Sequence, residues 1–386
     1  MDKLKIGVIG AGTMGSGIAQ VFAASGHETL LFDADPQMVT KAKKGHGETM
    51  SRLVEKGKIS KEIADKTLSN LKYIASPGEF SECGLVIEAI IENLDIKQKL
   101  FNDIEKIVDE DCILGTNTSS LSVTSIASVC NKPERVIGVH FFNPAPLMPL
   151  VEIVKGLTTN HSTEKKTKEI IDALGKSSVL AKDTPGFIVN RIARPYYGEA
   201  IRIYEEGIAD FATIDAAMKD HGFKMGPFEL MDLIGNDINY TVTETVWSQF
   251  FFDARYKPSL TQKRLFEAKR FGKKTGQGYY SYLPGSDSPL PLKDDLLSEK
   301  IFMRILSMLI NEAAEALYYG IASKEDIDLA MTKGVNYPKG LLKWCDEIGV
   351  DNILSVLSAL KEDYSEERYR PGLLLKRMVK EGKKFY

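Results

Sequence analysis

Hydrophobic and polar positions follow two different patterns along the chain. From Leu4 to about Asp183, short apolar runs rich in β-branched residues alternate with stretches of helical periodicity. Apolar runs of this kind are typical of a parallel sheet that helices cover on both faces. The expected strands are Lys5–Ile9, Glu28–Phe32, Leu85–Ala89, Cys112–Gly115, Arg135–His140, Leu150–Val154 and Ser178–Ala181. The expected helices between them include Met14–Ser25, Pro36–Lys44 and Ile96–Val108.

After Asp183 the strand pattern stops, and long amphipathic segments such as Ile188–Glu206 and Ile214–His221 predict helices. An internal repeat with a period of about 113 residues runs through this part of the chain. The recurring groups are Glu199-Ala200 with Glu312-Ala313, Gly207–Ala209 with Gly320–Ala322, Ile214-Asp215 with Ile327-Asp328, Asp232–Gly235 with Asp346–Gly349, and Pro258–Leu260 with Pro371–Leu373. The Pro-, Gly- and Ser-rich segment Leu283–Pro289 marks a linker between the copies. We therefore expect an α/β domain over 1–183 and two tandem all-α domains over 184–286 and 287–386.

A glycine-rich segment stands between the first expected strand and the helix that follows it. It reads Gly10-Ala11-Gly12-Thr13-Met14-Gly15. Gly10 permits a tight turn, Gly12 lets backbone amides approach a pyrophosphate, and Gly15 lets helix and strand pack closely. The diphosphate would lie on the N-terminus of the helix, where free N–H groups favour negative charge. This context predicts a Rossmann-type dinucleotide site.

Asp33, at the end of the second expected strand, bears on which dinucleotide is bound. A carboxylate at this position accepts hydrogen bonds from both ribose hydroxyls of NAD and repels the 2′-phosphate of NADP. NAD is therefore the expected cofactor. The alternative is that Asp33 only caps the helix beginning near Pro36.

Composition and charge limit the partners. Apolar residues make up 43% of the chain and charged residues 27%, as in an ordinary globular enzyme. A net charge of -3 argues against nucleic acids and anionic membranes as partners. The four cysteines lack metal-type spacing, so we expect neither a disulfide framework nor a metal site. With no expected signal peptide and no apolar stretch of membrane-spanning length, a cytoplasmic location is expected.

Polar side chains follow the ends of neighbouring expected strands, where open α/β sheets bind their ligands. The segments are Thr116–Ser120 and His140–Pro144, with Glu152 in the next strand. Imidazole titrates near working pH, so His140 is the candidate that removes a hydroxyl proton while hydride leaves the same carbon. Glu152 would fix the tautomer of His140 and stabilise its imidazolium form. The alternatives are a core histidine bonded to backbone and an exposed strand carboxylate.

Ser119 and Asn190 are further candidates, because both side chains can donate hydrogen bonds to a substrate oxygen. The alternatives are an ordinary turn serine and a helix-start asparagine.

Together these segments resemble the 3-hydroxyacyl-CoA dehydrogenase family over essentially the whole chain. The matching stretches are Gly7–Gly17 with Asp33, Glu88–Asn93, Asn117–Leu121, His140–Pro144, Lys182–Arg191, Met225–Glu229 and Phe271–Gly276. The resemblance implies NAD-dependent, reversible oxidation of the C3 hydroxyl of a short (S)-3-hydroxyacyl-CoA, a reaction of fatty acid β-oxidation.

The resemblance also implies roles for individual residues. His140 would be the general base and Glu152 its partner, with Ser119 and Asn190 holding the substrate's oxygens. Glu92, Lys97 and Asn143 would lie along the cofactor. Lys56 would lie near the adenosine end of coenzyme A; the alternative is a solvated surface lysine without a role.

The second helical copy departs from the first. Where the first reads Lys224–Glu229, the second reads Pro338–Lys343 without the Met-Gly-Pro-Phe-Glu pattern, so we expect a structural role for it. In shorter relatives the helical domain forms a homodimer interface, which a tandem copy can supply within one chain. A monomer is therefore expected, with a homodimer as the alternative.

Two other functions fit the sequence less well. A catalytically silent, crystallin-like NAD-binding protein is disfavoured because Ser119, His140, Glu152 and Asn190 are all present. A lysine-dependent β-hydroxyacid dehydrogenase is disfavoured because Arg191, and no lysine, follows Asn190 closely. Pocket shape, which the sequence does not give, decides between 3-hydroxybutyryl-CoA and a carboxylated analogue such as 3-hydroxyadipyl-CoA.

Overall fold

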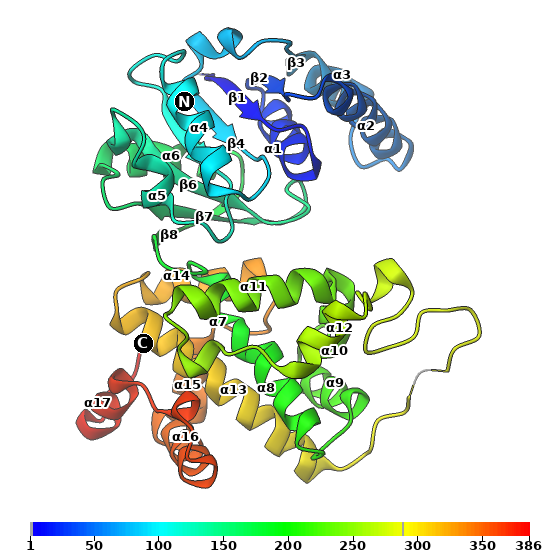
Figure 1. The fold of residues 1–386 in the computed structure, drawn as a ribbon, viewed down its shortest axis with the longest axis vertical. Helices are drawn as coiled ribbons and strands as arrows, with labels where there is room; N and C mark the ends of the chain where they lie inside the picture. Colours follow the sequence, from blue (N-terminus) through cyan, green and yellow to red (C-terminus); the bar gives the residue numbers. More distant parts are fainter. Residues whose placement is uncertain (1–2, 288) are drawn as a thin grey trace. The chain divides into compact units, whose positions relative to one another are not determined.

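The strands of the first half form one sheet in the computed structural model, which describes residues 3–287 and 289–386. Within those residues the sheet has eight strands in the order β3-β2-β1-β4-β5-β6-β7-β8 (Figure 1). Neighbours from β3 to β6 pair in parallel, which confirms the predicted α/β class. The bounds are β1 Lys5–Ile9, β2 Glu28–Phe32, β3 Leu71–Tyr73, β4 Leu85–Glu88, β5 Ile113–Thr116, β6 Val136–Phe141, β7 Leu150–Lys155 and β8 Ser177–Lys182.

The direction of β7 corrects the expectation of a purely parallel sheet. β7 runs antiparallel to β6, and β8 runs parallel to β7. The connection from β6 to β7, residues 142–149, is shorter than the dozen or so residues that a parallel crossover needs. The reversal places Glu152, in the middle of β7, directly opposite His140.

Helices pack against the sheet and enclose its apolar core. Ile18 and Phe22 of α1 share one buried cluster with Ile6 and Val8 of β1, and α6 contributes Ile170 to the same cluster. The helices of this half are α1 Thr13–Ala24, α2 Pro36–Glu55, α3 Lys61–Asn70, η1 Pro77–Glu82, α4 Leu94–Glu105, α5 Val123–Ala127, η2 Pro133–Arg135 and α6 His161–Ala173. The second helix is longer than predicted, ending at Glu55 rather than Lys44.

The second half is helical, as predicted. Its elements are α7 Val189–Ile192, α8 Arg194–Glu205, α9 Phe211–Asp220, α10 Pro227–Ile234, α11 Asn236–Gln249, η3 Ala254–Tyr256, α12 Leu260–Glu267, η4 Lys273–Thr275, α13 Asp295–Tyr318, α14 Lys324–Gly334, α15 Leu341–Ile348, α16 Val350–Tyr364, η5 Glu367–Tyr369 and α17 Leu373–Glu381. The single helix expected over Ile188–Glu206 is divided at Ala193. Pro195 explains the division, because proline has no N–H to continue the preceding helix.

The chain divides into two compact units, Met1–Thr184 and Pro185–Tyr386. Both helical copies lie within the second unit, and their description as two domains divided at 286 stays a prediction. Ser288, in the predicted linker, lies outside the described residues. Among the residues that are described, no helix combines the length and apolarity that a bilayer crossing demands.

The repeat recurs in the hydrogen bonds of the second unit. Asp215 accepts hydrogen bonds from the amides of Phe228 and Glu229, and Asp328 accepts them from the amides of Leu342 and Lys343. The hydroxyls of Tyr280 and Tyr386 donate to these two carboxylates, at 2.7 and 3.1 Å respectively. Corresponding residues therefore perform corresponding structural tasks in the two copies.

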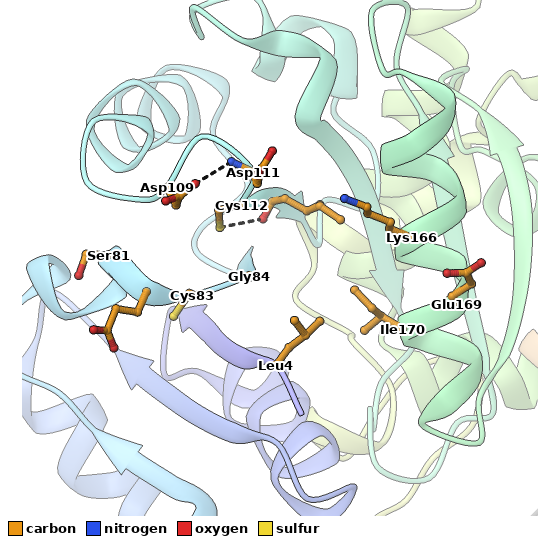
Figure 2. A pocket seen from close by; sticks show the side chains of 12 residues that line it. Leu4, Ser81, Cys83, Gly84, Asp109, Asp111, Cys112, Lys166, Glu169 and Ile170 are labelled. Atoms are coloured by element: carbon orange, nitrogen blue, oxygen red, sulfur yellow. Dashed lines mark hydrogen bonds between the residues drawn. The ribbon is translucent and has the colours of Figure 1, made fainter. Parts of the chain in front are cut away.

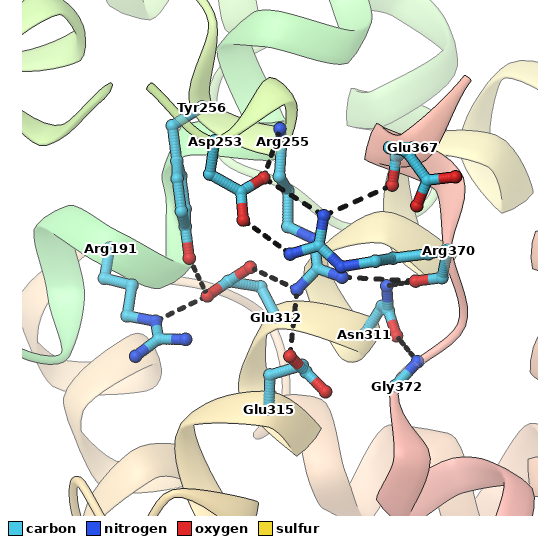
Figure 3. Close-up of polar contacts among 10 residues, drawn as sticks. All are labelled: Arg191, Asp253, Arg255, Tyr256, Asn311, Glu312, Glu315, Glu367, Arg370 and Gly372. Carbon is cyan, nitrogen blue, oxygen red and sulfur yellow. Dashed lines mark hydrogen bonds and ion pairs between the residues drawn. The ribbon is translucent and has the colours of Figure 1, made fainter. Parts of the chain in front are cut away.

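Several buried ion pairs join the copies within the described residues, and two of them are reciprocal. Arg191 of the first copy lies 2.5 Å from Glu312 of the second, and Arg304 of the second lies 2.6 Å from Glu199 of the first. Both carboxylates are fully enclosed, with 0% and 2% of the residue exposed. Figure 3 shows Glu312 held by Arg191 and also by Arg255 and Tyr256. The two copies thus form one continuous interior.

Candidate active site

The turn after β1 requires glycine at two positions. Gly10 has φ +103°, in the region that favours glycine, and its amide donates to the carbonyl of Phe32 at 2.8 Å. A Cβ on Gly15 would lie 1.8 Å from the carbonyl oxygen of Gly10, closer than any side chain can approach. These residues bring the start of α1 against the end of β1, as the glycine motif predicts.

The start of α1 faces open space. Gly12 precedes the helix, and a Cβ added there would meet nothing within 4 Å. No side chain caps this helix, and its first turn contains no acidic residue. Thr13 is exposed and Met14 half-buried at its first two positions. Uncapped amide groups at a helix N-terminus are suited to bind a diphosphate.

Asp33 points toward the glycine turn and does not cap α2. Its Oδ2 accepts a hydrogen bond from the amide of Ala11 at 2.7 Å, and its Oδ1 accepts one from the amide of Asp35 at 2.9 Å. The N-cap of α2 is Asp35, whose carboxylate accepts from the amide of Gln37. The capping alternative for Asp33 is therefore wrong.

A pocket of about 520 Å³ opens beside Asp33. Gly10, Gly12 and Asp33 line one part of it, and Ile90 and Ile91, which follow β4, line another. The pocket combines the glycine turn, a carboxylate and apolar walls, as a bound adenosine requires.

His140 and Glu152 form a buried pair. His140 Nδ1 lies 2.7 Å from Glu152 Oε2, and the two residues are 6% and 0% exposed. Glu152 is therefore not the exposed strand carboxylate of the alternative interpretation, and the partner of His140 Nδ1 is a carboxylate. The ring of Phe142 packs against the imidazole, with centroids 4.5 Å apart. A histidine held in this way can take up and return a proton at its other nitrogen.

A second buried charge cluster joins the end of β4, the loop after it and α4. Lys97 lies 2.5 Å from Glu88 and 3.3 Å from Glu92, and its side chain is 1% exposed. Glu88, to which sequence reasoning gave no role, also accepts from the hydroxyl of Thr116 at 2.8 Å. Its position at the last residue of β4 was the available signal. A contact between Lys97 and the cofactor stays a prediction.

Glu92 ties this loop to the turn after β5. Its Oε1 accepts from the Thr118 hydroxyl at 2.6 Å and from the amides of Ser119 and Ser120 at 3.0 and 3.2 Å. Burial raises the pKa of Glu92, but the charge of Lys97 and the hydrogen bonds from these donors outweigh burial. The pKa of Glu92 is therefore below its ordinary value. Glu92 therefore stays ionised and fixes the position of Ser119.

Asn117, which belongs to the predicted polar segment Thr116–Ser120 but received no role of its own, connects this turn to β6. Its side-chain oxygen accepts a hydrogen bond from the amide of Phe141, next to His140, at 2.8 Å. The structure thus joins the loops after β4 and β5 and the end of β6 into one network.

Three further predicted site residues lie in the loop after β6, at the end of α2 and in α7. Asn143 is exposed in the loop after β6, and Lys56 is exposed at the C-terminal end of α2. Asn190 belongs to the second unit, where it lies in α7 and is half-buried. The roles of all three stay predictions.

A larger pocket, of about 580 Å³, lies at the amino-terminal ends of the strands, away from the glycine turn. Figure 2 shows the side chains that line it. Leu4, Gly84 and Cys112 line it, and these precede β1, β4 and β5. Burial raises the pKa of the Cys112 thiol to about 12, so it stays protonated and unreactive at neutral pH. This pocket contains no predicted site residue, and ligands of open α/β sheets bind at the carboxyl ends of the strands.

The chain matches two family models. The 3-hydroxyacyl-CoA dehydrogenase NAD binding domain matches residues 5–184. The C-terminal domain of the same family matches residues 186–282 and residues 301–385, that is, a large part of each helical copy.

Individual relatives agree with these models. The 3-hydroxyadipyl-CoA dehydrogenase of Escherichia coli is 38% identical, over 96% of this chain and 96% of that protein. Human mitochondrial hydroxyacyl-coenzyme A dehydrogenase is 42% identical, over 71% of this chain and 90% of that protein. The crystal structure of a 3-hydroxybutyryl-CoA dehydrogenase from E. coli superposes with a TM-score of 0.94 at 35% identity, covering 99% of this chain and all of that one.

Proposed function

The chain belongs to the 3-hydroxyacyl-CoA dehydrogenase family, and we propose that His140 and Glu152 carry out the proton transfer of its reaction. It is an NAD-dependent oxidoreductase that oxidises the C3 hydroxyl of a 3-hydroxyacyl-CoA. The observation that carries the proposal is the 2.7 Å contact between the imidazole and the enclosed carboxylate.

The residues around the glycine turn fit NAD. The uncapped start of α1 suits the diphosphate, and Asp33 suits the two ribose hydroxyls. When bound, NAD supplies the acceptor for the hydride that leaves C3. Glu92, Lys97 and Asn143 are proposed to lie along it, with Lys97 acting through its charge and through the position it gives Glu92.

His140 takes the proton. As the C3 hydroxyl becomes a carbonyl, the O–H bond breaks and its proton moves to Nε2 of His140. The imidazolium that results is stabilised by Glu152, whose carboxylate accepts the Nδ1–H hydrogen bond. In the reverse direction His140 returns the proton to the carbonyl oxygen.

Ser119 and Asn190 are proposed to hold the oxygens of the substrate by donating hydrogen bonds. Glu92 supports this role for Ser119, because it fixes the backbone of the turn that carries the hydroxyl. Lys56 is proposed to contact the phosphates of coenzyme A, since it is exposed and carries no ion pair among the described residues.

The chain is proposed to act as a monomer. The second helical copy gives the first a partner through the reciprocal pairs Arg191–Glu312 and Arg304–Glu199. The family resemblance places a second subunit at this surface in shorter relatives. Light scattering coupled to size-exclusion chromatography tests this, and a mass of two chains would contradict it.

The activity itself is tested by following NADH absorbance, at about 340 nm, with acetoacetyl-CoA as substrate. The proposal predicts oxidation of NADH that depends on the acyl-CoA and that NADPH supports poorly. Absence of turnover with acetoacetyl-CoA and with longer 3-ketoacyl-CoAs would contradict it.

A further inference from the structure

Arg194 is a buried cation with no carboxylate partner. The residue opens α8 and is 8% exposed. Its Nε donates to the carbonyl of Asn190 at 2.8 Å, its Nη1 donates to the Thr243 hydroxyl at 3.3 Å, and its guanidinium stacks on the Tyr197 ring at 5.0 Å. Among the described residues, no carboxylate oxygen lies within 4.0 Å of it. The other buried arginines shown in Figure 3, Arg191 and Arg255, each contact a glutamate.

Such an arrangement is costly. Burial lowers the pKa of Arg194, although a guanidinium stays charged at any ordinary pH. A buried charge is normally paired, because removing it from water without a counter-charge is strongly unfavourable. The missing negative charge points to a ligand that supplies it.

Tyr337 provides a second unsatisfied donor beside Arg194. Its hydroxyl is buried and has no hydrogen-bond partner among the described residues. The ring centroid of Tyr337 lies 5.7 Å from that of Tyr196, whose ring in turn contacts Tyr197. The Tyr337 hydroxyl interacts electrostatically with Arg194 and Tyr197. Tyr337 follows α14, so it comes from the second helical copy.

The second copy shows that the fold does not require polar residues here. Asn239, Thr243 and Gln262 form a buried network beside Arg194, with Gln262 Nε2 donating to Asn239 Oδ1 at 2.8 Å. The corresponding residues of the second copy are counted from the repeated pairs Gly235 and Gly349, Pro258 and Pro371, and Arg191 and Arg304. They are Ile353 for Asn239, Leu357 for Thr243, Leu375 for Gln262, Ser307 for Arg194 and Met303 for Asn190. Ile353, Leu357 and Leu375 are all fully buried. An apolar interior therefore packs equally well at these positions, and the polar one serves another purpose.

We propose that Arg194 and Tyr337 bind a carboxylate at the far end of the substrate's acyl chain, so that the enzyme prefers dicarboxylic acyl-CoAs. This inference rests on the proposed function, in which Asn190 holds a substrate oxygen. Asn190 lies in α7 and Arg194 opens α8, and the 2.8 Å hydrogen bond from Arg194 Nε to the carbonyl of Asn190 makes the two residues neighbours. In a six-carbon dicarboxylic chain, three carbon–carbon bonds of about 1.5 Å each separate C3 from the terminal carboxyl carbon. The two groups therefore lie close together in the substrate, as Asn190 and Arg194 do in the chain's fold.

The test compares two substrates of equal chain length. We compare kcat/KM for 3-oxoadipyl-CoA, which ends in a carboxylate, with kcat/KM for 3-oxohexanoyl-CoA, which ends in a methyl group. The ratio of kcat/KM for 3-oxoadipyl-CoA to kcat/KM for 3-oxohexanoyl-CoA should be well above one in the wild type. Arg194→Met should lower this ratio by about 10- to 100-fold, mainly because kcat/KM for 3-oxoadipyl-CoA falls. Tyr337→Phe should lower the same ratio by a smaller factor. Calorimetric binding of adipyl-CoA against hexanoyl-CoA gives a readout that does not depend on turnover.

Matched controls are available in the same unit. Arg368→Met removes another buried arginine that stacks on a tyrosine, and Tyr279→Phe removes another buried, unpartnered hydroxyl. Both should leave the ratio unchanged. A wild-type ratio near one, or equal losses on both substrates in the Arg194 and Tyr337 variants, would overturn the inference. An enzyme that turns over 3-oxohexanoyl-CoA and shows no preference for the substrate with a carboxylate would overturn this inference and leave the proposed function intact.

Discussion

Glu152 lies directly opposite His140 in the antiparallel pairing of β6 with β7, and its Oε2 is 2.7 Å from His140 Nδ1. A carboxylate at this distance from Nδ1 favours the tautomer that carries its proton there and leaves Nε2 able to accept another. Because the two side chains are almost fully enclosed, their interaction is weakly screened by water. In the proposed mechanism the pair orients the base and stabilises its charged form.

Glu152→Gln should lower kcat by roughly 10²-fold or more while leaving the KM for NADH little changed, because the amide cannot stabilise an imidazolium as a carboxylate does. The assay follows NADH with acetoacetyl-CoA. Glu169→Gln, which makes the same change at an exposed position on α6, serves as the control. Wild-type turnover in the Glu152 variant would contradict the assigned partnership.

Asp33→Asn should weaken NAD binding and narrow the preference for NAD over NADP, because it removes the charge that repels a 2′-phosphate. The measurement is kcat/KM for both reduced cofactors. Asp35→Asn is the matched control two residues away, since Asp35 caps α2. It should change stability by at most about 1 kcal/mol and leave the cofactor preference unchanged. An unaltered preference in the Asp33 variant would dismiss the ribose role.

His46 makes stability depend on pH. Its ring nitrogens contact the Ser16 and Tyr73 hydroxyls at 2.9 and 2.8 Å, and burial lowers its pKa below the ordinary 6.5. The unfolded chain therefore binds a proton at a pH where the folded chain does not. The contribution of His46 is present above the ordinary pKa and is lost as the pH falls below it.

Thermal unfolding from about pH 8 to about pH 5 checks this expectation. The midpoint should fall on acidification in the wild type and should fall less in His46→Gln, which keeps polar groups but does not titrate. Parallel curves for the two proteins would exclude His46 as a source of the dependence.

Arg304→Met should destabilise the helical unit by about 3–5 kcal/mol, because it leaves the enclosed Glu199 without its cationic partner, with only the Tyr369 hydroxyl to donate to it. Adding Glu199→Leu should restore part of that loss. Urea unfolding followed by circular dichroism measures both. Lys168→Met, which removes an exposed pair with Asp172, should cost less than about 1 kcal/mol. Strictly additive effects of Arg304→Met and Glu199→Leu would argue against a coupled pair.

Much of the fold follows from the apolar periodicity, and the exceptions have identifiable causes. β1 and β2 begin and end where predicted, since each contains a short apolar run, Ile6–Ile9 and Leu30–Phe32, that stops at Gly10 or at Asp33. β3 was missed because it is a three-residue edge strand with Lys72 at its centre. The direction of β7 was missed because apolar runs carry no information about direction, although the short connection before it does.

The site was predicted in part for similar reasons. A glycine motif and a strand-end histidine are local signals, and they identified the glycine turn and His140. The burial of Lys97 was not foreseen, because on a helical pattern it reads as a surface lysine; only the fold brings Glu88 and Glu92 to it. Likewise, the sequence cannot distinguish Asp33 from Asp35 as the cap of α2, which depends on where the helix begins.

His140→Gln provides the most direct test of the proton-transfer mechanism. The account predicts that kcat for acetoacetyl-CoA reduction falls by roughly 10²-fold or more while the Kd for NADH, measured by fluorescence titration, stays within a few-fold of the wild type. Turnover near the wild-type rate in a folded His140→Gln protein would contradict the assignment of His140 as the catalytic base.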